Sequence, residues 1–399
     1  MQRIASLGRI SDDQNWLTRT YGSSAMTRAN EQVALWMKEA GMATRHDAIG
    51  NLIGHYPAAG ADAKILLLGS HLDTVRNAGK FDGPLGVLVA IAAVQHFNNR
   101  NVRFPFAIEV IGFADEEGTR FQSAYLGSKS IAGRFKNGDL ERTDAAGITL
   151  SDAISTFGGD PGKLDSARMD PARLLGYFEV HIEQGPVLEK NDLSVGVVTA
   201  IAGQTRARLT FQGVAGHAGT VPMALRHDAL CATAEFILGA EAEARSVDGL
   251  VATVGQITTL PGASNVIPAE VALSLDVRHA EDSKRAGACS NLRSLAKQIA
   301  ERRGVTVNWE LIQESLSVTC DSGFVAKLQK IVARHQAKSI SLASGAGHDA
   351  VPLSKITRVG MLFVRCKGGI SHHPDESATV EDVRVAIAVL TDFIEQVTN

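Results

Sequence analysis

The sequence predicts a two-domain protein of the α/β class, in which a smaller α+β module interrupts a larger α/β domain. Three observations support this prediction. Short apolar runs typical of buried strands alternate with helical patterns over roughly the first 200 residues. Near residue 203 the strands change to an alternation of polar and apolar residues, which is typical of a sheet with one face in water. A fully apolar run then returns at 361–365.

The larger domain is expected to begin with a helix over 30–40, where apolar residues recur at helical spacing and Gly41 follows as a stop signal. Between 135 and 174 the pattern weakens, so no element is expected there. A second helix, rich in Val, Ile and Ala, is expected at 87–97. The predicted buried strands of this domain are 50–56, 65–68, 107–113 and 177–182.

The smaller module is expected between residues 204 and 317. Its predicted strands are 205–211 and 271–277, and its predicted helices are 224–244 and 283–302. The larger domain would then be discontinuous, formed by 1–203 and 318–399. It would end with the strand at 361–365 and a helix over 380–397.

The composition limits the classes of function. With 399 residues, a net charge of -3, 45% hydrophobic and 21% charged residues, the chain is expected to be globular. This charge gives no sign of a nucleic-acid or anionic-membrane partner. The four cysteines form no C-x-x-C pair, which indicates reduced thiols. Without a signal-peptide core or an apolar run of ~18 residues, a cytoplasmic protein is expected.

Six histidines and carboxylates follow apolar runs or lie in glycine-rich turns. In α/β sheets, ligand-binding groups collect beyond the carboxyl ends of the strands, so residues far apart in sequence can converge. Imidazoles and carboxylates bind divalent cations, and two cations roughly 3.5–4 Å apart can activate a water molecule between them. The pattern therefore predicts a metal-dependent hydrolase. The residues are His71, Asp82, Glu116, Glu117, His181 and His372.

Two acidic residues have more specific predicted roles. Asp73 follows His71 by two positions, so its side chain is expected to orient that imidazole. Asp82 precedes a Gly-Pro turn, and its two oxygens are suited to bridge two cations. Each residue alone also fits a structural histidine, a turn former or a solvated acid. The ordered combination at strand ends favours the metal site.

Five short motifs resemble those of the M20-type amidohydrolases, in the branch of allantoate amidohydrolases and N-carbamoyl-L-amino acid hydrolases. The resemblance spans essentially the whole chain. It implies a di-metal catalytic domain with an inserted lid and dimerisation domain. The motifs lie at 70–74, 79–83, 116–118, 181–186 and 369–372.

The resemblance also implies a division of the metal ligands. One cation would be held by His71, Asp82 and His181, and the other by Asp82, Glu117 and His372. Zinc or manganese would be the metals, with cobalt or nickel also compatible with these ligands.

Two further points concern the same site. Glu116 would be the general base that takes a proton from the bridging water. His373 directly follows His372, and if His373 were the ligand instead, the second metal's assignment would change.

Residues of the inserted module resemble substrate ligands of this family. His217 would reach the active site of a partner subunit and stabilise the oxyanion, which implies a homodimer formed through 204–317. Asn265 and Arg278 would bind the substrate carboxylate, for which the planar guanidinium is well suited.

The larger domain would add two more contacts. Gln184 is expected to hydrogen-bond a ureido group, and Gly347 to expose its backbone to the substrate. For the neighbours His348 and Asp349, the sequence leaves two alternatives open: residues that line the pocket, or structural residues.

The expected substrate is a small ureido carboxylate. Segments 202–206, 217–223 and 365–371 look closer to allantoate amidohydrolases, which favours allantoate, cleaved to ureidoglycine (ureidoglycolate), ammonia and CO2. The alternative is an N-carbamoyl-L-amino acid. A non-catalytic binding protein with the M20 fold is a further alternative. Peptidase activity is less favoured, because His181 stands where many M20 peptidases have a carboxylate.

Overall fold

The computed structural model describes residues 1–398, apart from the side chain of Asn137, and divides into two compact units. The first unit comprises Met1–Thr199, Cys320–Leu342 and the segment from Ala346 onward. The second comprises Ala200–Thr319 and Ala343–Gly345. The return of 343–345 to the second unit was not expected from the sequence.

A nine-stranded mixed sheet has the order β1-β2-β4-β3-β5-β16-β6-β14, with β15 beside β6, and all of it except β14 and the last residues of β6 and β15 belongs to the first unit. The central strands β4, β3, β5 and β16 are parallel, and the outer strands β1, β2, β6 and β14 pair antiparallel. Every residue of β4 and β16 is buried, which explains their continuous apolar sequences. The strands are β1 (Ala43–His46), β2 (Leu52–Tyr56), β3 (Ile65–His71), β4 (Ala107–Phe113), β5 (Leu174–Ile182), β6 (Val195–Ile201), β14 (Val318–Thr319), β15 (Ser341–Ser344) and β16 (Val359–Val364).

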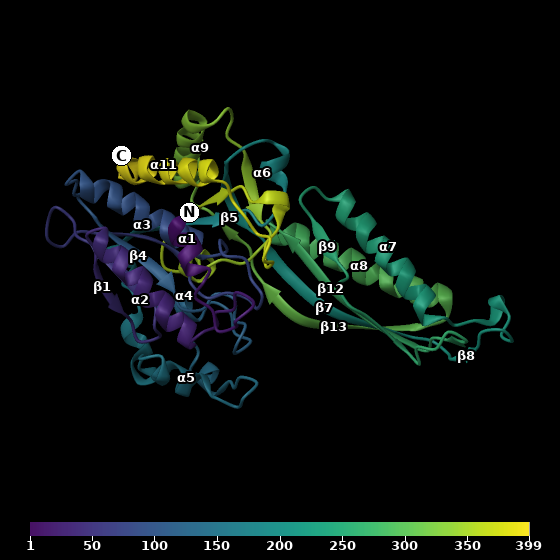
Figure 1. Cartoon of the computed structure of the whole chain (residues 1–399). Coiled ribbons are helices and arrows are strands. Elements are labelled where there is room, and N and C mark those ends of the chain that lie inside the picture. The colour runs from purple at the N-terminus through teal and green to yellow at the C-terminus, as the bar shows by residue number, and fades with distance from the viewer. Residues whose placement is uncertain (399) are drawn as a thin grey trace. The chain divides into compact units, whose positions relative to one another are not determined.

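Helices pack against this sheet and form the main core with it (Figure 1). Phe178 of β5 stacks on Phe393 of α11 with ring centroids 4.5 Å apart. The helices of the first unit are α1 (Gln2–Leu7), α2 (Ser24–Glu39), α3 (Pro84–Asn99), α4 (Leu126–Ile131), α5 (Leu150–Thr156), α6 (Val187–Lys190), α9 (Ser322–His335), α10 (Ala350–Leu353) and α11 (Val380–Gln396). Among residues 1–398, no helix is long and apolar enough to cross a bilayer.

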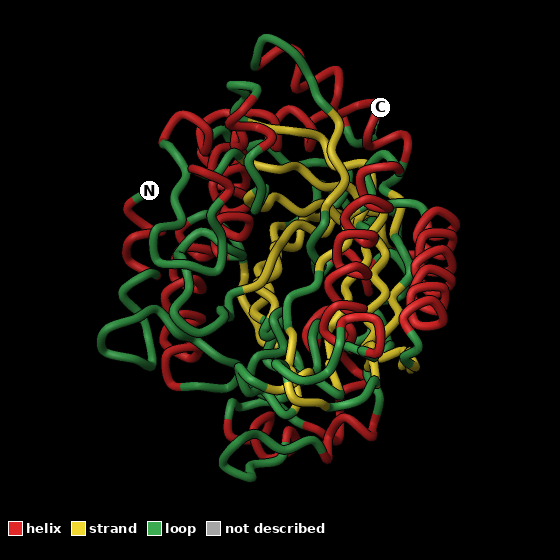
Figure 2. Tube along the Cα trace, turned by 90° about the vertical axis from the view of Figure 1, so that its right-hand side faces the viewer, coloured by secondary structure: helices red, strands yellow, loops and turns green. Residues whose placement is uncertain are grey.

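The second unit is a five-stranded antiparallel sheet with two long helices on one face (Figure 1; helices red and strands yellow in Figure 2). In β12 buried residues alternate with partly exposed ones, as the sequence predicts for a sheet with one wet face. The elements are β7 (Gly203–Gln212), α7 (Ala229–Ser246), β9 (Val251–Thr253), β10 (Ile257–Leu260), β12 (Glu270–His279), α8 (Asp282–Arg303) and β13 (Thr306–Ser315). A separate two-stranded ribbon pairs β8 (Gly216–His217) with β11 (Val266–Ile267).

The structure corrects several predicted element boundaries. Helix α2 begins at Ser24 rather than at residue 30, because the Ser23 hydroxyl caps the Met26 amide. Helix α7 begins at Ala229 rather than at 224, because Asp228 caps it and Pro222 precedes a separate short turn. The sequence prediction missed α5, in the segment where no element was expected, and it also missed β6, α9 and β13.

Candidate metal centre

Two histidines lie at the carboxyl ends of neighbouring parallel strands. His71 is the last residue of β3 and His181 is the penultimate residue of β5, so both belong to the strands rather than to the loops beyond them. Their rings lie 5.7 Å apart and are almost fully buried. The Nδ1 atoms lie 3.1 Å from the Asp73 carbonyl oxygen and 3.0 Å from that of Ile182, respectively. Because a carbonyl can only accept, each Nδ1 is the donor, and each Nε2 faces Asp82, where it can bind a cation once it is deprotonated.

Asp82 lies between these histidines and a third one. Its Oδ1 is 3.1 Å from Nε2 of His181 and 3.6 Å from Nε2 of His71. Its Oδ2 is 3.2 Å from Nε2 of His372. The turn that presents Asp82 needs Gly83, which has a φ of 81° and caps α3, because a Cβ there would lie 2.5 Å from the His71 ring.

His372, and not His373, faces this cluster. The Nε2 of His372 lies 3.4 Å from Oε1 of Glu117 as well as 3.2 Å from Asp82. The Nδ1 of His373 instead accepts a hydrogen bond from the Asp375 amide in an exposed turn. The geometry therefore supports the choice of His372 made from the resemblance.

The donor atoms fit two divalent cations. Of the four groups of histidines and carboxylates whose donor atoms lie within 4.8 Å of one another, two share Asp82. Ligand atoms at about 2.1 Å from a tetrahedral ion are separated by roughly 3.4 Å, close to the contacts measured here. The buried Nε2 of His181 also has no hydrogen bond among the described residues. The two groups are His71, Asp82 and His181, and Asp82, Glu117 and His372.

The charges of the cluster are strongly coupled. Burial alone would raise the pKa of Asp82, but contacts with His181, His372 and His71 hold that pKa well below its usual range. Contacts with Asp82 and Glu117 raise the pKa of His372 to about 10. The carboxylates therefore draw positive charge into the cluster, which is the electrostatic condition for binding cations.

Glu116 is buried next to Glu117. Burial and the neighbouring Glu117 carboxylate raise the pKa of Glu116 well above its usual value. One Glu116 oxygen lies within 4.8 Å of donor atoms of His71 and Glu117. Glu116 is thus close to the cation ligands and suited to hold a proton.

Asp73 has a second function that the sequence did not reveal. Its Oδ1 lies 3.4 Å from Nδ1 of His71, in line with the predicted orienting role. Its two oxygens also accept the amides of Glu116 at 3.0 Å and Glu117 at 3.2 Å. Asp73 therefore holds the backbone of both glutamates as well as the first histidine.

Gln184 lies in the cluster itself. Its Nε2 donates to Oδ2 of Asp82 at 2.9 Å and to the Ser371 hydroxyl at 3.2 Å. Its Oε1 is buried and makes no hydrogen bond within residues 1–398.

The loop around Gly347 is tightly packed. A Cβ on Gly347 would lie 1.7 Å from the Tyr125 hydroxyl, so this position needs glycine for packing. His348 is buried with its ring edge-on to His181 at 4.6 Å, and Asp349 accepts the Ser128 hydroxyl at 2.5 Å. His348 and Asp349 therefore support the cluster from within the protein.

In the second unit, His217 and Asn265 lie together. His217 in β8 pairs with Val266 in β11, and the Ala218 amide donates to the Asn265 carbonyl at 2.9 Å. The Nδ1 of His217 accepts the Gly219 amide at 3.0 Å. The ribbon thus places the two predicted substrate residues side by side.

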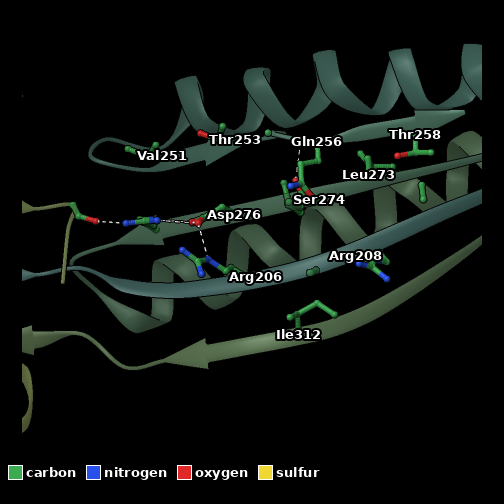
Figure 3. Close-up of a pocket in the computed structure, with 16 residues that line it drawn as sticks. Arg206, Arg208, Val251, Thr253, Gln256, Thr258, Leu273, Ser274, Asp276 and Ile312 are labelled. Carbon is green, nitrogen blue, oxygen red and sulfur yellow. Dashed lines mark hydrogen bonds and ion pairs between the residues drawn. The ribbon is translucent and has the colours of Figure 1, made fainter. Parts of the chain in front are cut away.

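Arg278 lies near the end of β12, on the wet face of the sheet. A hollow of about 1020 Å³ on this face includes Arg278, Asp276 and Arg206 in its lining (Figure 3). Asp276 accepts two hydrogen bonds from Arg278, both at 2.9 Å, and one from Arg206 at 3.1 Å (Figure 3). Asp276, which was not among the predicted site residues, fixes the orientation of the Arg278 guanidinium.

Comparison with known proteins identifies the family. The model of the peptidase family M20/M25/M40 matches residues 67–396. This chain belongs to that family. Allantoate deiminase 2 of Glycine max is 41% identical, with 98% of this chain and 88% of that protein covered. An N-carbamoyl-L-amino acid amidohydrolase of Geobacillus stearothermophilus is also 41% identical, with 99% and 97% covered. The crystal structure of a hydantoinase/carbamoylase family amidase from Burkholderia multivorans superposes with a TM-score of 0.93 at 30% identity, with 99% and 96% covered.

Proposed function

We propose that this M20-family protein is a metal-dependent amidohydrolase that cleaves the ureido C–N bond of a small carboxylate, and that this carboxylate is allantoate. The observation that carries the proposal is the pair of cation-binding groups that share Asp82, with buried Glu116 beside them. The similarity to an allantoate deiminase and to an N-carbamoyl-L-amino acid amidohydrolase indicates the class of bond.

Two divalent cations, zinc or manganese, would polarise the carbamoyl carbonyl and lower the pKa of the attacking water. Glu116 would take the proton of that water and deliver it to the leaving nitrogen. The raised pKa of Glu116 suits a carboxylate that must carry a proton during the reaction. Hydrolysis of allantoate in this way gives ureidoglycine, ammonia and CO2.

Gln184 and Arg278 are the residues that we expect to hold the two ends of the substrate. The unpaired Oε1 of Gln184 would accept an N–H of the ureido group. Arg278 donates to Asp276 from Nε and Nη2 and to the Gly345 carbonyl from Nη1, which leaves one N–H on each Nη for the carboxylate. Because Asp276 already fixes the guanidinium, little conformational entropy is lost when the substrate binds.

The second unit also supports the proposed homodimer. The ribbon with His217 and Asn265 continues from the Glu270 end of β12, whereas Arg278 lies near the other end (Figure 1). At about 3.3 Å per residue, the stretch from Glu270 to Arg278 spans roughly 26 Å. This is much longer than a small ureido carboxylate, so one chain cannot place His217 and Arg278 on the same substrate molecule. A partner chain would therefore contribute His217 and Asn265.

Two substrates fit the same chemistry, and the relatives include enzymes named for each. The polar contacts from Gln184, Asn265 and Arg278 favour allantoate, which carries two ureido groups and one carboxylate. The test is ammonia release by the metal-loaded protein from allantoate and, in parallel, from a series of N-carbamoyl-L-amino acids. Faster turnover of allantoate is expected. Rapid decarbamoylation of the amino acids without turnover of allantoate would contradict the substrate and leave the reaction class standing.

A further inference from the structure

Glu376 lies buried in the loop that carries His372, against the loop that carries Asp82. It is 2% exposed, and no lysine, arginine or histidine of residues 1–398 forms an ion pair with it. Its Oε1 accepts the amide of Phe81 at 2.7 Å and that of Asp82 at 3.0 Å. A buried carboxylate without a cationic partner is costly, which indicates that these two amide contacts are needed at this place.

The other oxygen of Glu376 reaches the loop of His372. The hydroxyl of Ser371 lies 3.4 Å from Oε2 of Glu376 and donates to Oδ2 of Asp82 at 2.7 Å. Ser371 directly precedes His372 in the chain. Glu376 and Ser371 thus join two loops that are almost three hundred residues apart in sequence.

A glycine makes this contact possible. A Cβ on Gly79 would lie 2.3 Å from Cβ and Cδ of Glu376, closer than any real contact. The φ of Gly79 is not in the left-handed region, so this glycine is required for space and not for backbone conformation. The Gly79 turn and Glu376 are therefore packed as one unit.

The bridging role of Asp82 depends on its orientation. One oxygen has to face His71 and His181 while the other faces His372, so a small rotation of the backbone would move one of the two away from its cation. The two amide contacts of Glu376 fix the backbone at Asp82, and the Ser371 hydroxyl fixes Oδ2. We propose that Glu376 is a positioning residue that holds the bridging carboxylate of Asp82 in register with His372 and so sets the affinity for the second cation. This inference rests on the proposed di-metal function.

The test uses the full-length protein, stripped of metal and titrated with Mn²⁺ or Zn²⁺. Glu376→Ala removes both amide contacts, and Glu376→Gln keeps one oxygen that can accept them. Gly79→Ala forces Glu376 away without changing it. Asp375→Asn is the matched control, because it removes an adjacent carboxylate that is exposed. Each variant is measured for cation affinity by calorimetry, for metal content after dialysis, for kcat and KM, and for thermal stability.

We expect Glu376→Ala and Gly79→Ala to bind the second cation about 10–100-fold more weakly, the usual cost of losing a group that supports metal ligands. The first cation and KM should change little, and excess metal should restore kcat. The affinity of Glu376→Gln for the second cation should lie between those of wild type and Glu376→Ala, and the affinity of Asp375→Asn should match that of wild type.

Several results would overturn the inference. The first is that the folded variants bind both cations as tightly as wild type. The second is that the variants lose thermal stability while their cation affinity stays unchanged. If Glu376→Ala does not fold, Gly79→Ala and Glu376→Gln decide the question by the same affinities. A wild-type protein that binds fewer than two cations would instead refute the proposed function.

Discussion

The proposed exchange of His217 between subunits makes a quantitative prediction for mixed dimers. The perturbation combines two inactive chains, one with Glu116→Gln and one with His217→Ala. Loss of a general base lowers the rate by about 10²–10⁴-fold, and loss of an oxyanion donor by about 10²–10³-fold. Each variant alone should therefore have little activity.

The geometry of the second unit determines how much activity a mixture of the two variants should recover. Roughly 26 Å of β12, and the ribbon beyond it, separate His217 from Arg278, so in the proposed dimer each site would take His217 from the other chain. In a mixed dimer, the site with intact Glu116 then also receives an intact His217, and the second site lacks both. Random pairing makes about half of the dimers mixed, so the mixture should recover about 25% of wild-type activity.

The assay is ammonia release after co-expression of the two chains with different tags, and the mixed dimer isolated by both tags should reach about half of wild-type activity. A control pairs Glu116→Gln with His372→Ala. Both of these changes lie in the same first unit, so no site in that mixed dimer is complete. Two results would refute the reasoning. One is recovery of activity in the control, and the other is no recovery of activity when a confirmed mixed dimer pairs Glu116→Gln with His217→Ala.

Three further predictions concern the first unit. Asp73→Ala leaves the buried amides of Glu116 and Glu117 without acceptors, so kcat should fall about 10–100-fold. An unchanged kcat in a fully metal-loaded protein would contradict this role of Asp73. The raised pKa of His372, about 10, means that the metal-free protein carries a proton there at neutral pH, which a cation must displace. Cation affinity should therefore increase with pH up to about 10, with proton release visible by calorimetry in buffers of different ionisation enthalpy; an affinity independent of pH would argue against it. His372→Ala should lose one cation by metal analysis, whereas His373→Ala should keep both, and the reverse result would exchange their roles.

The histidines and acids of the cluster were accessible from the sequence because they follow the most regular part of the fold. His71 and His181 end buried parallel strands, and such strands bring their carboxyl ends to one edge of a sheet. The remaining proposed ligands came from the five motifs, whose order along the chain resembles that of the M20-type amidohydrolases. The convergence of His71 and His181 could be predicted from the strand pattern alone, without the details of any loop.

The supporting residues were not accessible in this way. Glu376 contacts Phe81 and Asp82 across almost three hundred residues, through backbone amides that are present at nearly every position. No residue type marks an amide that will need a buried acceptor, so spacing cannot reveal the partner. The same reason explains why the contacts of Asp73 with the glutamate amides were missed.

The fold could be predicted from the sequence where a strand is buried on one face only or on both faces. The alternation in β7 gave the open sheet of the second unit, and the apolar run in β16 gave the return to the first. By contrast, β13 has seven exposed and three partly exposed residues and no buried one, so it has no clear period of two. Helix α5 is only seven residues long, too short for a helical period to stand out.

The most direct test of the di-metal hydrolase is a titration of the metal-stripped protein with Mn²⁺ or Zn²⁺, with ammonia release from allantoate measured at each step. The paired groups that share Asp82 predict that activity rises with added metal and reaches its plateau at two cations per chain. Full activity without bound metal, or a plateau at one cation, would contradict the account.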